Sequence, residues 1–151
     1  MAVLVTLMAV AAPRVSRSMR GHNLEQQGAR LQALTEYSRD EATSLGVPMT
    51  VWVDPDTRRF GTGVKPGYTA DAAHTKEYTL PADLSFDPIQ GGVASKTEGH
   101  GFDVAEFAPD GTLEAASVAT VRIANRTQRS GISVSLTADG YGYTVVEEAG
   151  Q

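Results

Sequence analysis

Residues 24–53 read LEQQGARLQALTEYSRDEATSLGVPMTVWV, and the hydrophobic pattern changes its period within this stretch. Before Gly46 the apolar and small residues recur at helical spacing, and after Pro48 apolar and other residues alternate as in a strand. A glycine just past the last turn, followed by a proline, is a usual helix end. The stretch therefore predicts a helix that ends at Leu45 and leads directly into a β-strand. The predicted buried face of this helix consists of Leu24, Leu31, Leu34, Ser38, Ala42 and Leu45.

Upstream of this helix face, residues 1–12 carry no charge and are followed by Pro13 and three arginines, Arg14, Arg17 and Arg20. Twelve helical residues rise only about 18 Å, whereas a membrane span needs about 20 residues. A signal peptide would carry its basic residues before the apolar run, and a core helix would show a polar face. We favour the remnant of a membrane anchor whose first part lies upstream. The predicted anchor side chains are Val3, Leu4, Val5, Leu7, Met8 and Val10.

The predicted organisation is a helix over residues 1–45 and a β domain over residues 46–151. Residues 13–45 form the amphipathic half of the helix, which packs on the sheet, and Gly28 within it costs about 1 kcal/mol relative to alanine. Residues 1–30 hold four arginines and one glutamate, a net charge of +3, and the remaining nine basic and 17 acidic residues give −8. Because nucleic-acid binding depends on a basic face, the acidic body makes a nucleic-acid partner unlikely.

Downstream of residue 48 the chain alternates apolar and polar residues in short runs separated by turn residues. Runs of this kind after one helix predict an α+β fold, with the helix packed on one or more antiparallel β-sheets. Residues 61–76 and 87–101 show little periodicity and are predicted to be surface loops. The predicted strands cover residues 49–53, 58–60, 77–80, 84–86, 102–107, 119–123, 132–136 and 143–146.

The sequence offers few groups for catalysis or cofactor binding. It contains no cysteine, no nucleophile elbow, no phosphate-binding loop and no dinucleotide motif. His22, His74 and His100 are far apart and lack the spacing of a zinc site. We therefore expect no enzymatic activity, no cofactor and no metal centre.

Acidic residues near the first predicted hairpin leave one metal alternative open. Asp54 and Asp56 flank Pro55 in the turn and could share a calcium ion with Asp83 or Asp87. No glycine-centred ligand loop surrounds them, and a plain turn stabilised by aspartate is the favoured interpretation.

Arg122, Arg126 and Arg129 concentrate positive charge near the last hairpins. They are interpreted as solvated residues that protect a sheet edge, with contact to phosphates as the alternative. Trp52 is predicted to be a core or sheet-face side chain.

Four landmarks in a fixed order resemble the GspH/FimT-type minor pseudopilins of type II secretion and type IV pilus systems. The helix-to-strand junction is similar to that of this family, and so are a Leu-Pro strand entry, a Phe-x-x-x-Gly turn and a closing hairpin. The family's peptidase site, a glycine followed by Phe-Thr-Leu and a glutamate, is absent from this chain. The matching residues are 39–42 with 46–53, 80–86, 107–111, and 132–136 with Gly140.

The resemblance implies a pilin-like subunit of a type II secretion pseudopilus tip, without catalysis. Its partners would be other minor and major pseudopilins and the lipid of the inner membrane, which its N-terminal helix crosses once. The C-terminal domain would lie in the periplasm, and Arg14, Arg17 and Arg20 would lie at the lipid headgroups. The alternative is a FimT-like type IV pilus subunit that binds DNA through Arg122, Arg126 and Arg129.

Overall fold

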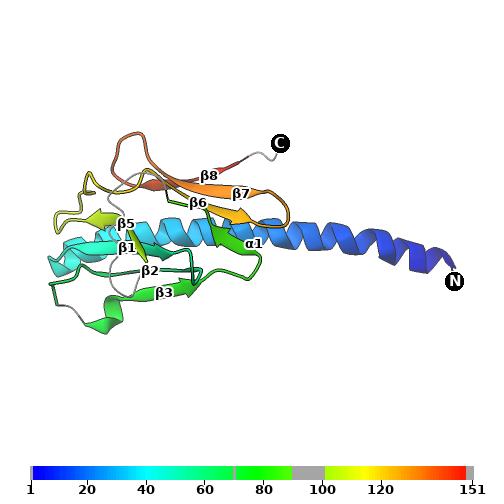
Figure 1. The fold of residues 1–151 in the computed structure, drawn as a ribbon, viewed down its shortest axis with the longest axis horizontal. Helices are drawn as coiled ribbons and strands as arrows, with labels where there is room; N and C mark the ends of the chain where they lie inside the picture. The colour runs from blue at the N-terminus through cyan, green and yellow to red at the C-terminus, as the bar shows by residue number, and fades with distance from the viewer. Residues whose placement is uncertain (1, 70, 90–100, 149–151) are drawn as a thin grey trace.

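The computed structural model begins with one long helix, α1, over Ala2–Leu45 (Figure 1). It describes the backbone of residues 2–69, 71–89 and 101–148, and the side chains of these residues from 21 onward except residue 72. The helix ends where the sequence predicts, because Gly46 adopts a φ of 67° and its N–H donates to the Ala42 carbonyl at 3.0 Å. No helix in the described part of the chain is long and apolar enough to cross a membrane.

Two antiparallel four-stranded sheets follow the helix, which confirms the α+β, pilin-like fold class. In the first sheet the order is β3-β2-β1-β5, and in the second it is β4-β6-β7-β8. A short 3₁₀ helix, η1 (Ala72–His74), precedes β3. The strands are β1 (Met49–Asp54), β2 (Arg59–Val64), β3 (Lys76–Thr79), β4 (Leu84–Phe86), β5 (Phe102–Phe107), β6 (Thr120–Asn125), β7 (Gly131–Leu136) and β8 (Tyr143–Glu147).

The prediction that residues 61–76 form a loop is wrong at its start, because β2 continues to Val64. Gly61 and its neighbours give no apolar alternation, so the pattern hides the strand. A Cβ atom on Gly61 would lie 2.3 Å from the Lys76 carbonyl and 2.8 Å from the ring of Trp52. Only glycine fits at this position, which allows Trp52 to be buried on β1. Of the other predicted loop, residues 90–100 lie outside the described residues.

The C-terminal half of α1 lies between the two sheets and contacts both of them (Figure 1). The helix, the inner face of the first sheet and the inner face of the second sheet bury one common hydrophobic core. Its fully buried large side chains are Leu31, Met49, Val51, Val53, Phe60, Leu84, Phe107, Val118, Ile123, Ile132 and Val134.

Two contacts fix the height of β7 and β8 along the helix. A Cβ atom on Gly28 would lie 3.0 Å from the side chain of Ile132 on β7. Four residues further along α1, Gln32 Oε1 accepts the backbone N–H of Val145 on β8 at 3.3 Å. Gly28 therefore permits the close approach of the second sheet, and this explains a glycine inside a long helix.

The segment after β5 closes the edge of the first sheet and ties it to the second. The Val118 N–H donates to the Val104 carbonyl on β5 at 2.7 Å. From β8, the Tyr143 hydroxyl donates to the Val118 carbonyl at 2.8 Å, and burial raises the pKa of Tyr143 to about 12. The hydrogen bond and the apolar ring together link the two sheets beside the helix.

Replacing Gly28→Leu is expected to destabilise the fold by about 1–3 kcal/mol, because a larger side chain forces α1 away from Ile132. The measurement is urea unfolding followed by circular dichroism. Gly21→Leu is the matched control, since nothing lies within 4 Å of a Cβ there, and it should leave stability unchanged or slightly raised. Equal effects at the two positions would contradict the close-approach explanation.

Candidate functional site

The buried face of α1 packs against both sheets. Leu24, Leu31 and Leu34 are buried, and Leu45 packs partly buried against the same core. The helix begins at Ala2, and its N-terminal part extends beyond the two sheets (Figure 1). The contacts with the sheets lie on its C-terminal half.

Polar side chains within this interface are held by specific partners. The hydroxyls of Ser38 on α1 and Thr62 on β2 lie 2.5 Å apart, and Ser38 also donates to the Leu34 carbonyl at 2.8 Å. Thr62 donates to the Thr50 carbonyl at 2.9 Å. Because buried hydroxyls are costly when unpaired, these contacts favour one register of helix against sheet.

Aromatic and charged groups join the exposed side of α1 to β3 and η1. The Arg30 guanidinium lies 4.8 Å above the Tyr78 ring, and the Lys76 ammonium lies 3.8 Å above the Tyr37 ring. His74 Nδ1 lies 2.5 Å from the carboxylate of Glu41 on the helix. The second of the three histidines is therefore a structural contact between α1 and η1. His22 is exposed on the helix, and His100 lies outside the described residues.

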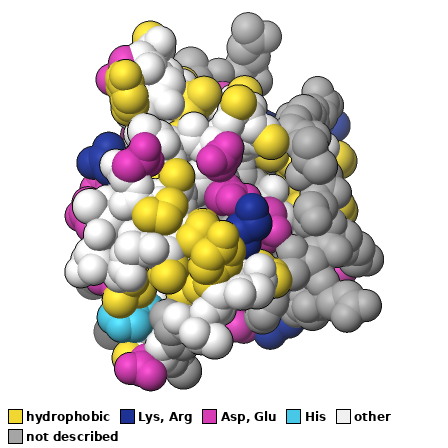
Figure 2. All heavy atoms as spheres, turned by 90° about the vertical axis from the view of Figure 1, so that its left-hand side faces the viewer, with side chains coloured by type: hydrophobic (Ala, Val, Ile, Leu, Met, Phe, Trp, Pro, Cys, Tyr) yellow, Lys and Arg dark blue, Asp and Glu magenta, His cyan; other side chains and the backbone are white. Residues whose placement is uncertain are grey.

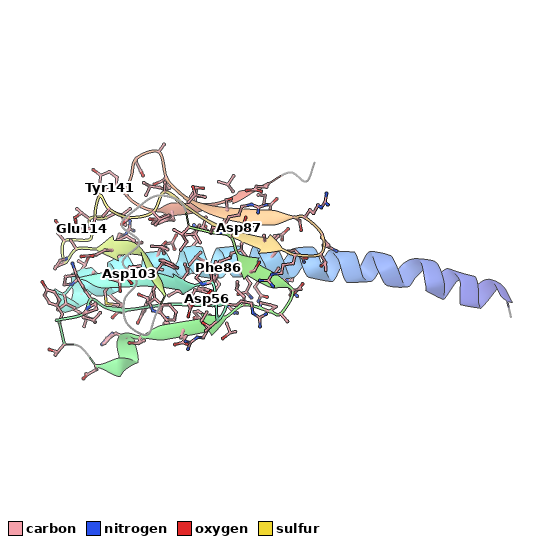
Figure 3. The ribbon with its side chains drawn as sticks, viewed as in Figure 1. Asp56, Phe86, Asp87, Asp103, Glu114 and Tyr141 are labelled. Atoms are coloured by element: carbon pink, nitrogen blue, oxygen red, sulfur yellow. The ribbon has the colours of Figure 1, made fainter. Side chains whose placement is uncertain are left out.

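Arg122 lies on β6, which is an inner strand, so the prediction that it protects a sheet edge is wrong. Its Nη1 pairs with Asp87 (labelled in Figure 3), and its Nε donates to Glu148 at 2.9 Å. Ser133 also donates to Glu148, at 2.8 Å. These partners raise the pKa of Arg122, and the same bonds lower the pKa of Glu148. The charge is already compensated within the chain.

These partners lie 35 and 26 residues away in sequence, and no local pattern pairs them with Arg122. The guanidinium fits here because Gly131, on the neighbouring strand, leaves room for it. A Cβ on Gly131 would lie 2.4 Å from the guanidinium Nη2. The acidic pair Glu147-Glu148 near the C-terminus is a sequence feature that could have indicated a partner for Arg122.

Arg126 and Arg129 lie in the turn between β6 and β7, and both are exposed. The turn is built on Asn125, which is 3% exposed. Its Oδ1 accepts the Thr127 N–H at 2.9 Å and the Gln128 N–H at 3.2 Å. The turn therefore presents the two guanidinium groups from a fixed backbone.

In the first hairpin turn, Asp54 accepts hydrogen bonds from the turn itself, as the favoured interpretation predicts. Asp54 Oδ1 accepts the Asp56 N–H at 3.1 Å, and Oδ2 accepts the Thr57 hydroxyl at 2.6 Å. These bonds lower the pKa of Asp54. Asp83 accepts the Asn125 amide at 3.3 Å, and Asp87 pairs with Arg122. No group of three or more potential metal ligands occurs among the described residues.

The predicted anchor residues and the three arginines after Pro13, called the stalk arginines below, lie on the N-terminal half of α1. Its backbone is helical from Ala2, and it extends well beyond the two sheets (Figure 1). Their side chains lie outside the described part of the structure. They are Val3, Leu4, Val5, Leu7, Met8, Val10, Arg14, Arg17 and Arg20.

The opposite end of the domain combines apolar and acidic side chains. Figure 2 shows hydrophobic groups gathered at the middle of this end, with carboxylates and a basic group beside them. Tyr141 (labelled in Figure 3) is 63% exposed, and Tyr68 after β2 is 52% exposed. Lys65 pairs with Glu106 at 2.6 Å next to a hollow of about 330 Å³, which Glu114 also lines. Such a mixed surface suits contact with another protein.

A long N-terminal helix packed between two antiparallel four-stranded sheets defines a pilin-like fold. The crystal structure of the minor pseudopilin EpsH from the type II secretion system of Vibrio cholerae is similar, with a TM-score of 0.57 and 14% identity. The match covers 86% of this chain and 97% of that one. The type IV minor pilin FimU of Pseudomonas aeruginosa matches with a TM-score of 0.54 and 19% identity, over 86% and 91% of the chains.

The family model for the type II transport protein GspH matches residues 27–140. The chain therefore belongs to the GspH family, the minor pseudopilins of type II secretion, and is a structural protein and not an enzyme. The two solved structures agree with this in fold. No protein with a curated description matches the sequence.

Replacing Glu148→Gln is expected to flatten the dependence of stability on pH. The pKa of Glu148 is lowered in the folded chain, so its stabilisation is present above the unfolded pKa and is lost as pH falls through the folded pKa. Because the side chain is 42% exposed, the loss should be below about 1 kcal/mol. The measurement is urea unfolding of both proteins between about pH 6 and pH 3. An unchanged pH profile would show that the Arg122 pair contributes no stability.

Proposed function

We propose that this chain waits in the inner membrane by the apolar start of α1 and then joins the tip of a type II secretion pseudopilus. The observation that carries the proposal is the length of α1, whose N-terminal part continues as a helix well beyond both sheets (Figure 1). An apolar helical half outside its own domain needs lipid or other helices to cover it. Residues 1–12 provide this apolar surface, through Val3, Leu4, Val5, Leu7, Met8 and Val10.

In this proposal the chain has three parts with different environments. Residues 1–12 lie in the membrane, residues 13–45 hold the domain by packing on the sheets, and residues 46–151 lie in the periplasm. The packing is supported by the burial of Leu24, Leu31 and Leu34 and by the partial burial of Leu45. Assembly moves the apolar helix from lipid into a bundle of helices from other minor and major pseudopilins, and needs no catalytic group.

The alternative function is that of a FimT-like type IV pilus subunit that binds DNA through Arg122, Arg126 and Arg129. The pairing of Arg122 with Asp87 and Glu148 speaks against it, because a guanidinium neutralised within the chain is a poor phosphate ligand. The net charge of −5 also opposes association with DNA. Both observations favour the secretion pseudopilus.

The double substitution Leu4→Arg/Leu7→Arg is expected to release the chain from the membrane fraction and to abolish secretion by the host. Each arginine at the centre of an apolar membrane helix costs about 2.5–3.5 kcal/mol. The measurements are fractionation after alkaline extraction and the amount of secreted protein in the medium. Both are made in a host strain whose own copy of the gene is deleted.

Ala33→Arg is the matched control, because residue 33 is exposed on α1 within the domain, and it should leave both measurements unchanged. A double variant that stays in alkali-resistant membranes and supports secretion would refute the anchor. A gene deletion that spares secretion but reduces DNA uptake would favour the type IV pilus alternative.

A further inference from the structure

The turn between β6 and β7 lies at the end of the domain from which α1 extends toward its N-terminus (Figure 1). Arg126 and Arg129 are exposed on this turn. Within the part of the chain that the structure describes, no hydrogen bond or ion pair joins either guanidinium to another group. Unlike Arg122 at the start of the same hairpin, neither guanidinium is neutralised by a described group.

The two arginines are held in place by the backbone of the turn. Asn125 is buried and accepts two backbone N–H groups of the turn, and its amide donates to Asp83 at 3.3 Å. Arg129 adopts a φ of 52°, in the left-handed region where glycine or asparagine is usual. A long charged side chain is thus kept at a backbone position that ordinarily favours smaller residues.

The height of the turn along α1 follows from the contacts that fix β7 and β8. Ile132 packs at Gly28, and Val145, the cross-strand partner of Val134, bonds to Gln32. Strand β7 therefore runs in the same direction as the helix. Strand β7 begins at Gly131, one strand residue before Ile132, which places its start about two helical residues closer to the N-terminus than Gly28. Arg129 lies in the turn before this strand, at most about 10 Å from Ile132, and is therefore level with a residue of α1 between about 21 and 26.

The sequence places three further arginines close to the same level. Arg14, Arg17 and Arg20 precede this level by about one to twelve positions, a rise of about 2–18 Å along the helix axis. Along this axis Arg20 is within about one Debye length of the turn at 0.1 M salt, so the stalk arginines add positive charge at the same end of the domain.

Some acidic groups lie at the same end and reduce this positive charge. Glu25 is exposed on α1, and Glu147, the cross-strand partner of Ile132, is exposed on β8. Asp56, labelled nearer the middle of the domain in Figure 3, is exposed on the turn between β1 and β2. Asp83 accepts the Asn125 amide, and Asp54 accepts bonds within its own turn. Arg58, in the same turn as Asp56, donates to the Pro81 carbonyl at 3.4 Å. Among the described side chains of this end, Arg126 and Arg129 are exposed cations without a described partner.

We infer that Arg126 and Arg129 bind the phosphates of anionic lipids while α1 is in the membrane, and so seat the β domain on the membrane surface before assembly. This inference rests on the proposed anchoring of the chain. A flat lipid surface suits cations that share one level, and an anchored chain needs only a few of them because each adds to an existing attachment. Duplex DNA would need a broader basic face than this acidic body offers.

The experiment uses the full chain, which has no cysteine and so accepts a single label. Gln128→Cys carries a fluorophore on the turn, and the chain is reconstituted into phosphatidylcholine vesicles with or without phosphatidylglycerol, each with a quencher on the headgroups. Quenching should increase with phosphatidylglycerol and decrease with added salt. Removing the arginines by Arg126→Gln/Arg129→Gln should lower the docked population about fivefold for each arginine.

Two controls separate local contact from net charge. Arg39→Gln/Lys65→Gln removes the same number of charges at the opposite end of the domain and should leave the quenching at residue 128 unchanged. A label at Asp139→Cys, in the turn between β7 and β8, should show no dependence on phosphatidylglycerol. Equal quenching at residue 128 in both kinds of vesicle, or unchanged quenching in the double-arginine variant, would overturn the lipid contact.

The same samples distinguish this failure from a failure of the anchor. A chain that leaves the vesicles on alkaline washing refutes the anchored subunit itself, whereas a retained chain with an undocked turn refutes only the lipid contact. Duplex DNA is added in a parallel gel-shift measurement at low salt. A shift that Arg126→Gln/Arg129→Gln abolishes, combined with no effect of phosphatidylglycerol, would reassign the turn to nucleic acid.

Discussion

Burial of one face of α1 between two sheets is the interaction on which the rest of this structure depends. The inner faces of the two sheets meet the same stretch of helix, and Leu31 is fully enclosed where they do. Two four-stranded sheets of this size bury enough apolar surface for stability only when a helix completes the core. The helix must therefore end before β1, and the left-handed Gly46 lets the chain reverse within a few residues.

The close packing of α1 between the two sheets also explains glycine and polar residues on the helix that its hydrophobic pattern does not explain. Gly28 lets β7 approach closely, and Gln32 then reaches the backbone of β8 as another strand would. Ser38 faces Thr62 because the first sheet is equally close. A larger residue at position 28 would push α1 away from β7 by steric overlap. An apolar residue at position 32 would weaken the contact between α1 and β8, because it would leave the Val145 N–H unpaired.

The fold could be predicted from the sequence wherever the evidence was local. The helix end at Leu45 follows from Gly46 and Pro48, and the later strands follow from alternation. The extension of β2 was missed because a glycine breaks the alternating pattern at position 61. A glycine is needed there because the Trp52 ring on the neighbouring strand β1 leaves no room for a side chain, and this tertiary contact is not visible in the sequence. The role of Arg122 was mistaken for the same reason, since its carboxylate partners come from distant parts of the chain. Local sequence patterns predict helices and strands. The partners of a buried or half-buried charge can be found only once the sheets are assembled.

The proposed step from membrane to filament would need permanent contacts within the domain and reversible contacts at the lipid surface. The packing of α1 on the sheets is apolar and shielded from water, so salt and assembly leave it intact. Contacts of Arg126 and Arg129 with headgroups would be exposed and screened, at about 1 kcal/mol each. In the proposed assembly the weaker set would open first, when the helix is drawn into a filament. Because Arg122 is neutralised by Asp87 and Glu148, that step would remove surface contacts without disturbing the core.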